Sequence, residues 1–274
     1  MSGISTATLS FFADLLEKET GNTLDASKSY LIVGRLTPLA RKLGYASLEK
    51  FAEAAGKPMG RDVREAIVDQ LTTHETSFFR DIRPFERLGE SILPTLDLSR
   101  PVKIWSAACS TGQEAYSIAM LLKEQAVKHP RLRFEIVGTD ISKETVERAK
   151  AGVYNEFEIK RGLSDERQRK YFTADGPREW RVNDDLRRTV QFRVDNILEP
   201  SVPRASQDLI FCRYVLIYLE RDVKRRALDQ ITQRFRIPHG RLFLGASEST
   251  LGLSEDFEWS RAEGSGVFQL KAAA

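Results

Sequence analysis

A run of small residues lies between a short apolar segment and a helical pattern at residues 102–118. Residues 102–105 are mostly apolar, residues 106–112 are small, and apolar residues recur at helical spacing after Gln113. A strand, a tight turn and a helix N-terminus in this order form a pocket of the kind that binds nucleotides. Gly112 is the only glycine of the turn, and neither a G-x-G-x-x-G pattern nor a P-loop is present. The turn therefore lacks a phosphate cradle, which disfavours NAD and ATP, and an ordinary βα turn is the alternative.

Two acidic residues lie at positions where they can contact a cofactor bound in such a pocket. Glu114 opens the helix, where it would repel a phosphate but suits the cationic methionyl end of S-adenosylmethionine. Asp140 ends the next predicted strand, residues 134–139, and its carboxylate can accept both hydroxyls of a ribose. A lone Asp after a strand is often the cap of the next helix, but Ser142 is available for that role. We therefore expect S-adenosylmethionine, with Asp140 at its ribose.

Two further segments follow later strands. Asn196 and Ile197 come after residues 190–194, where the amide can hydrogen-bond an adenine edge and the isoleucine can pack on its ring. The alternative for this segment is a plain polar loop. Arg213 ends a strand inside the predicted pocket, where a cation is costly unless a partner or ligand satisfies it. Tyr218 is expected either to offer its hydroxyl near the transferred group or to pack in the core.

Composition limits the classes of function. The chain has 274 residues, of which 41% are hydrophobic and 30% are charged, as in an ordinary soluble globular protein. No run is long and apolar enough to cross a membrane and no signal peptide is evident, so we expect a cytoplasmic protein. The only cysteines are Cys109 and Cys212, and the three histidines are scattered, so no metal site is expected. Cys109 is either a nucleophile at a helix N-terminus or, more simply, a small residue in a crowded turn.

The elements that position these residues fall into two parts. Residues 1–73 show helical periodicity and predict a small helical domain, and residues 74–83 predict a linker that contributes to the cofactor site. Residues 84–274 alternate strands and helices, which indicates a sheet built from βαβ units. A charged stretch at about residues 153–189 interrupts that alternation and predicts a small inserted subdomain.

The second predicted helix is basic. Its apolar stripe runs from Ile32 to Leu43 with Pro38 inside it, so the helix either kinks or restarts there. From Lys28 to Lys42 the chain has four basic residues and no acidic one, although the whole chain carries only +3. This local excess suits an acidic partner surface. Aromatic residues are not interleaved as stacking on nucleic acid would require.

Five segments resemble, in order, those of the chemotaxis receptor methyltransferases, the CheR family of S-adenosylmethionine-dependent protein-glutamate O-methyltransferases. They are TSFFR, WSAACSTGQEAYS, GTDIS, FCRYVLIY and GASES, at residues 76–80, 105–117, 138–142, 211–218 and 245–249. Each segment alone is weak evidence, but the ordered set spans nearly the whole chain and is highly specific. The resemblance implies an α/β fold: a small all-helical N-terminal domain, then a Rossmann-like methyltransferase domain with a small inserted β-subdomain. It also implies a monomer.

The resemblance further implies which residues form the site. The implied cofactor-binding residues are His74, Thr76, Arg80, Glu114, Asp140, Asn196, Ile197, Arg213 and Tyr214. Arg213 and Tyr218 would line the methyl-transfer site, and Arg35, Arg41 and Lys42 would face the receptor. The sequence departs from the family pattern at His74 and Tyr214, where relatives can have asparagine.

The implied reaction is displacement of the methyl group of S-adenosylmethionine by a glutamate oxygen of a chemoreceptor, which leaves S-adenosylhomocysteine. A carboxylate is already ionised at neutral pH, so no general base is required. In some relatives the inserted subdomain also binds a short peptide at the receptor C-terminus. Residues 171–180 are a few residues shorter than in those relatives, so we expect no dependence on that tether. The alternatives are an adaptor without turnover and a nucleic-acid methyltransferase.

Overall fold

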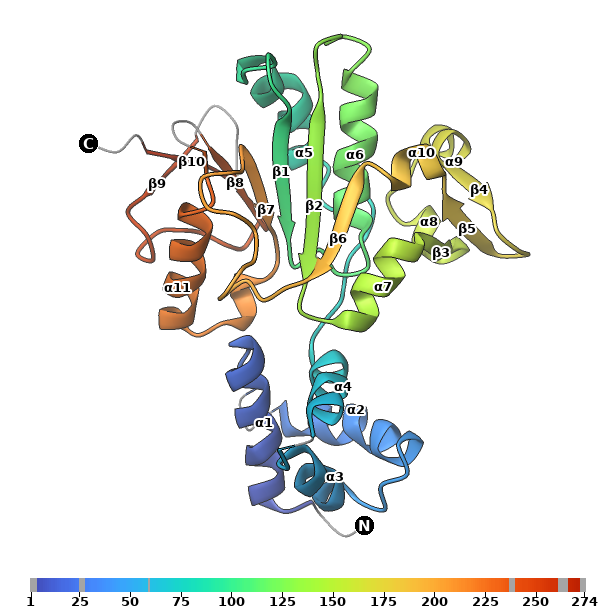
Figure 1. Cartoon of the computed structure of the whole chain (residues 1–274), viewed down its shortest axis with the longest axis vertical. Helices are drawn as coiled ribbons and strands as arrows, with labels where there is room; N and C mark the ends of the chain where they lie inside the picture. The colour runs from blue at the N-terminus through green and yellow to red at the C-terminus, as the bar shows by residue number, and fades with distance from the viewer. Residues whose placement is uncertain (1–3, 25–27, 59, 237–239, 261–265, 272–274) are drawn as a thin grey trace.

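The computed structural model describes residues 4–24, 28–58, 60–236, 240–260 and 266–271, so that His239, one of the three histidines, lies outside the described residues. A helical unit at the N-terminus and an α/β unit lie end to end, joined by the segment that follows α4 (Arg61–Leu71) (Figure 1). Within the described ranges, no helix has the length and apolar character that a membrane crossing requires.

The N-terminal unit consists of helices joined by short connections, as the periodicity predicts. Its helices are α1 (Thr6–Thr20), α2 (Ser29–Lys42), α3 (Leu48–Ala55) and α4. Ser5 and Ser47 cap α1 and α3, since each side chain accepts a backbone N–H of the first turn. Gly21 ends α1 with a left-handed φ of 75°. The apolar faces meet in one core that includes Phe12, Phe51 and Ile67.

Helix α2 continues through Pro38. A restart at this proline, one of the two alternatives, is therefore wrong. Leu43, expected on the apolar stripe, lies just beyond the helix and is 45% exposed. The proline removes the backbone bond to the carbonyl of Gly34. Both residues are exposed, so water can satisfy the freed carbonyl and the helix tolerates the proline.

The α/β unit is built on a seven-stranded sheet in the order β6-β2-β1-β7-β8-β10-β9. Its strands are β1 (Val102–Ala107), β2 (Phe134–Asp140), β6 (Val190–Val194), β7 (Leu209–Cys212), β8 (Arg241–Leu244), β9 (Phe257–Trp259) and β10 (Val267–Leu270). The first five strands in spatial order are parallel, β10 runs antiparallel to β8, and β9 runs antiparallel to β10. From β1 the chain moves to β2 on one side and later returns to β7 on the other. This reversal opens a crevice at the carboxyl ends of the strands.

Helices cover the sheet next to this crevice. They are α5 (Arg83–Arg87), α6 (Gln113–Gln125), α7 (Lys143–Ala151) and α11 (Arg221–Thr232). Helix α5 is followed by a π turn (Leu88–Ile92) and a 3₁₀ turn (Leu93–Thr95). Two apolar cores result, one around α5 and α6 and the other around α11.

The interruption after α7 forms a small antiparallel sheet, β3-β5-β4, with short helices around it (Figure 1). Its elements are β3 (Val153–Asn155), α8 (Glu156–Lys160), α9 (Asp165–Tyr171), β4 (Phe172–Ala174), β5 (Glu179–Val182) and α10 (Asp184–Arg187). Aromatic edge contacts join it to the linker, because Phe78 packs 5.0 Å from Tyr154 and 5.5 Å from Phe172 between ring centres. The insertion therefore anchors the linker that borders the crevice.

Candidate functional site

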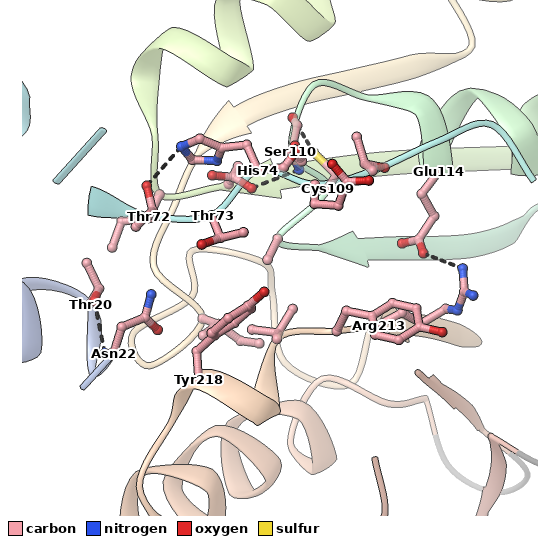
Figure 2. Close-up of a pocket in the computed structure, with 18 of the residues that line it drawn as sticks. Thr20, Asn22, Thr72, Thr73, His74, Cys109, Ser110, Glu114, Arg213 and Tyr218 are labelled. Atoms are coloured by element: carbon pink, nitrogen blue, oxygen red, sulfur yellow. Dashed lines mark hydrogen bonds and ion pairs between the residues drawn. The ribbon is translucent and has the colours of Figure 1, made fainter. Parts of the chain in front are cut away.

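A cleft lies where β1, β2, β6 and β7 end, and the helical unit contributes Thr20 and Asn22 to its wall. The empty space within it, with the open mouth included, is about 950 Å³. The linker forms one side, and Tyr218 and Arg213 lie opposite (Figure 2). Every cofactor residue expected from the sequence lines this cleft, as does Tyr218: His74, Thr76, Arg80, Glu114, Asp140, Asn196, Ile197, Arg213 and Tyr214.

The turn after β1 has a left-handed backbone at alternate residues. Ala108 has φ 54°, Ser110 has φ 51°, and Gly112 has φ 95° just before α6. This conformation costs about 1–2 kcal/mol for a residue with a Cβ, which favours small side chains in the turn. A Cβ on Gly112 would lie 2.9 Å from the Cβ of Ala149. The small residues thus let the turn pass close to α7 and direct the Ser110 N–H toward the carboxylate of Asp140.

Asp140 is a buried acceptor fixed by the backbone. Its Oδ2 accepts the N–H of Ser110 at 2.8 Å and its Oδ1 accepts the N–H of Ser142 at 3.0 Å. The hydroxyl of Ser142 caps α7 by accepting the N–H of Thr145, so the prediction for Ser142 is confirmed. Each carboxylate oxygen retains a lone pair for another donor. Asp140 can therefore still receive two hydroxyls.

Arg213 is paired with two carboxylates. Its Nη1 lies 3.1 Å from Oε2 of Glu114, and its Nη2 lies 3.0 Å from Oδ2 of Asp81. Nη2 also donates to the carbonyl of Arg80 at 2.7 Å. Only 2% of the side chain is exposed, and its Nε has no acceptor among the described residues. The prediction that this cation needs a partner is confirmed, although Asp81 was not among the expected residues.

Asp81 also fixes the ring of Tyr214, which lines the cleft. The hydroxyl of Tyr214 donates to its carboxylate, and the guanidinium of Arg80 lies 3.8 Å above the Tyr214 ring. Burial raises the pKa of the Tyr214 hydroxyl and the bond to Asp81 raises it further, so the hydroxyl stays protonated. Phe79, Asp81 and Tyr214 have φ of 47°, 53° and 60°. Together with Ala108 and Ser110 of the turn after β1, these residues account for all the described non-glycine residues with a positive φ except Ala205. Such strained backbone is common at functional sites.

Glu248 holds the loop after β7 in place through hydrogen bonds to its backbone. This carboxylate is 9% exposed and accepts four backbone N–H groups at 2.7–3.2 Å, those of Tyr214, Val215, Ile217 and Gly245. The loop that it holds begins at Arg213 and contains Tyr218. The sequence signal for Glu248 was the GASES segment, which carried no role on its own.

Asn196 and His74 join the helical unit to the cleft. The Nδ2 of Asn196 donates to the carbonyl of Glu19 at 3.0 Å, and its Oδ1 accepts the N–H of Leu198 at 2.9 Å. The Nε2 of His74 lies 2.9 Å from the hydroxyl of Thr72. Both side chains therefore have a structural contact that the sequence did not indicate.

Tyr218 lies at the mouth of the cleft. It is 37% exposed and its hydroxyl points into the cleft (Figure 2), so the alternative of plain core packing is wrong. Cys109 is buried at the inner end. Burial raises the pKa of its thiol well above the usual value, and the carboxylates of Asp140 and Glu114 raise it further. The thiol stays protonated, which supports the interpretation of Cys109 as a small packing residue.

The basic residues of α2 lie outside this cleft. The Nη1 of Arg35 donates to the carbonyls of Leu71 at 2.9 Å and Thr72 at 3.1 Å, at the end of α4. A cation there complements the helix dipole. Arg41 and Lys42 are exposed in the last turn of α2.

The cleft residues fit S-adenosylmethionine. Glu114 and Asp140 offer carboxylates to an ammonium group and a ribose diol, while Ile141 and Ile197 supply apolar walls for a purine. The cleft has no lysine among its described lining residues, and its two arginines are engaged within the protein, so a polyphosphate would find few donors.

Comparison with known proteins agrees with this chemistry. Residues 7–72 match the family model described as "CheR methyltransferase, all-alpha domain", and residues 74–264 match "CheR methyltransferase, SAM binding domain". The chain is 41% identical to a chemotaxis protein methyltransferase of Vibrio parahaemolyticus, over 95% of each chain. It is 38% identical to chemotaxis protein methyltransferase 1 of Pseudomonas aeruginosa, over 97% of this chain and 98% of the relative. The chain therefore belongs to the CheR methyltransferase family, and its cofactor is S-adenosylmethionine.

Proposed function

We propose that this protein methylates glutamate side chains in the cytoplasmic domains of chemoreceptors, as a monomer in the cytoplasm. The observation that carries the proposal is the cleft itself, which combines two carboxylates and a buried, paired arginine with no phosphate cradle. The similarity to proteins named chemotaxis protein methyltransferase supports the choice of receptors as substrates.

The proposed chemistry needs alignment rather than proton transfer. S-adenosylmethionine, when bound, supplies a methyl group on a cationic sulfur that a carboxylate oxygen can displace. The glutamate of the substrate is ionised at neutral pH, so no general base has to act. The protein would contribute by holding the reactants at attack distance and excluding water from the carboxylate.

Each side chain of the cleft has a proposed part in that alignment. Glu114 would hold the ammonium group and Asp140 the ribose, while Asn196 and Ile197 would border the adenine. On the linker side, the cofactor would be covered by His74, Thr76 and Arg80. Arg213, with Tyr214 beside it, would fix the position of Glu114 through the ion pair at 3.1 Å.

The receptor would meet the basic end of α2. Arg41 and Lys42 are exposed there and would offer charge to an acidic helix surface. Arg35 would act differently, since its Nη1 is bonded to the carbonyls that end α4. We propose that it holds α2 against α4 and so positions the other two cations.

Tyr218→Phe is expected to lower turnover about tenfold while the Kd for S-adenosylmethionine changes less than about twofold, because only one hydroxyl contact to the reacting groups is lost. Single-turnover kinetics and calorimetry measure the two quantities separately. Tyr30→Phe, which removes an exposed tyrosine hydroxyl on α2, is the matched control. An unchanged turnover in Tyr218→Phe would remove this residue from the transfer site.

We also propose that methylation does not depend on a peptide tether at the receptor C-terminus. The support is the short hairpin of the insertion, in which β4 ends at Ala174 and β5 begins at Glu179. Calorimetry with a five-residue peptide that corresponds to the receptor C-terminus should show no binding at micromolar concentrations. A measurable micromolar Kd would contradict the proposal.

One labelling experiment tests the proposed reaction against its rivals. The protein is incubated with methyl-labelled S-adenosylmethionine and either receptor-rich membranes or nucleic acid. Label on receptor protein that base releases as methanol supports a glutamyl methyl ester. Label in nucleic acid would indicate a nucleic-acid methyltransferase, and no label with intact cofactor binding would indicate an adaptor.

A further inference from the structure

In the described part of the chain, no helix covers one face of the sheet at the amino-terminal halves of β1, β2 and β6 (Figure 1). The side chains on this face that line the area are mostly polar and at least partly exposed: Lys103 and Glu135 near the amino ends, Val137 and Gln191 at mid-strand, and Arg193 toward the carboxyl end of β6. Their neighbours on the opposite face, Ile104, Ile136 and Phe192, are buried in the core. Parallel sheets are usually covered on both faces, so this polar area is an unpartnered surface.

A groove whose empty space, with its open side included, is about 1890 Å³ runs over this surface and around its edge to α9 and α10. We call it the basic groove, because its charged lining residues are Lys103, Lys123, Arg133, Lys170, Arg188 and Arg193 against only Glu135 and Asp185. Six cations against two carboxylates leave an excess of +4, which is more than the +3 of the whole chain. The rest of the molecule therefore carries no net positive charge.

Both carboxylates of the basic groove are already neutralised. Lys103 lies 3.2 Å from Glu135, and Lys123 lies 2.5 Å from Asp185. The remaining four cations have no carboxylate within ion-pair distance in the described part of the chain, and they are Arg133, Lys170, Arg188 and Arg193. The positive charge of the groove is therefore uncompensated by the protein.

The contacts of these four cations leave their charge accessible. Arg133 donates through Nη2 to the carbonyl of Ser99, and Arg193 donates through Nη2 to the amide oxygen of Gln191. Lys170 lies 5.2 Å from the centre of the Tyr171 ring. All four side chains are exposed, and a guanidinium retains further donors suited to a carboxylate.

The uncharged lining favours a polypeptide over a nucleic acid. Between the cations lie small or aliphatic side chains, among them Ala126, Val202 and Pro203. The aromatic rings of the groove are Phe134, which is half-buried, and Tyr171, which is 3% exposed. Neither presents an open face on which bases could stack.

We propose that the basic groove is a docking site for an acidic polypeptide segment of a partner protein. Carboxylates of that segment would pair with the four uncompensated cations, and its small side chains would pack on the aliphatic lining. The groove extends from the amino ends of β1 and β2 along one face to Arg193 of β6, and it shares no lining residue with the cofactor cleft at the carboxyl ends. A docked segment therefore leaves the cleft open, and the inference does not depend on the proposed reaction.

Fluorescently labelled poly-L-glutamate, titrated with the full chain and followed by anisotropy, tests this proposal. Saturable binding that weakens as salt is added is expected. The double variant Arg188→Glu with Arg193→Glu should bind at least about tenfold more weakly, because it replaces attraction by repulsion at two contacts. The neutral pair Arg188→Gln with Arg193→Gln should show an intermediate loss.

The matched control is Arg87→Glu with Arg226→Glu, which makes the same charge change at exposed sites outside the groove. It should keep binding within about twofold, since distant charges are screened. All variants should bind S-adenosylhomocysteine as the wild type does, which shows that they are folded. Absence of saturable binding, an equal loss in the control, or tighter binding of single-stranded RNA than of poly-L-glutamate would each overturn the proposal.

Discussion

Arg213→Ala is expected to weaken S-adenosylmethionine binding at least tenfold and to lower the free energy of unfolding by about 3 kcal/mol. Removing the guanidinium leaves Glu114, whose side chain is 12% exposed, without its cationic partner. It also frees Asp81 and the carbonyl of Arg80 from the donors that hold the linker against the cleft. Calorimetry with the cofactor and a urea titration of the free protein measure the two effects.

The expected loss depends on burial rather than on removal of an arginine as such. Arg225→Ala is the matched control, because Arg225 forms an ion pair with Asp222 on the exposed face of α11 and 45% of its side chain is exposed. Such surface pairs contribute about 0–1 kcal/mol, so this variant should differ little from the wild type. Arg213→Lys keeps the charge but lacks the fork that reaches Glu114 and Asp81 together, so it should lie between the two. If Arg213→Ala behaved like Arg225→Ala, the ion-pair network would not hold the cleft.

Local signals in the sequence predicted much of the site. Each of these signals lies within a few positions of the strand or helix that it affects. They are the small residues before Gln113, the carboxylate of Asp140 and the helix cap at Ser142. The position of Arg213 at the end of a strand inside the pocket also predicted that this cation needs a partner. Which partner it finds was not predictable, because Glu114 and Asp81 lie 99 and 132 positions away in the chain. The contact of Asn196 with Glu19 spans 177 positions and was missed for the same reason.

For the fold, too, elements with a clear local pattern were predicted and the others were not. The strand predicted at residues 134–139 agrees closely with β2. The edge strand β9 has three residues, too few for an alternation to be recognised. Helix α8 has five residues and is fixed by a capping box between Asn155 and Glu158, whose spacing was overlooked within a charged stretch. Pro38 was ambiguous because only the exposure of its helix face decides whether water can replace the lost bond.

Glu248 is the residue whose replacement should show how the transfer site is held together. Its two oxygens accept from four backbone N–H groups, two on each oxygen. Tyr214 is among the donors and has a left-handed φ of 60°, a conformation that needs support from its surroundings. Since the loop so held carries both Arg213 and Tyr218, Glu248 acts as a positioning residue for them.

Glu248→Gln is therefore expected to be nearly as harmful as Glu248→Ala, although glutamine matches glutamate in shape. The new amide nitrogen would face two backbone donors, and each buried donor left without an acceptor costs about 1–3 kcal/mol. We expect a loss of about 3 kcal/mol in the free energy of unfolding for the alanine variant, and turnover lower by on the order of 100-fold in both variants. Glu255→Gln, at an exposed glutamate nearby, is the control and should change neither quantity.

A merely structural role of Glu248 would lower stability but leave the turnover of the folded fraction intact. Turnover normalised to folded protein by cofactor-binding stoichiometry separates the two, and a normal value in Glu248→Gln would contradict the positioning role.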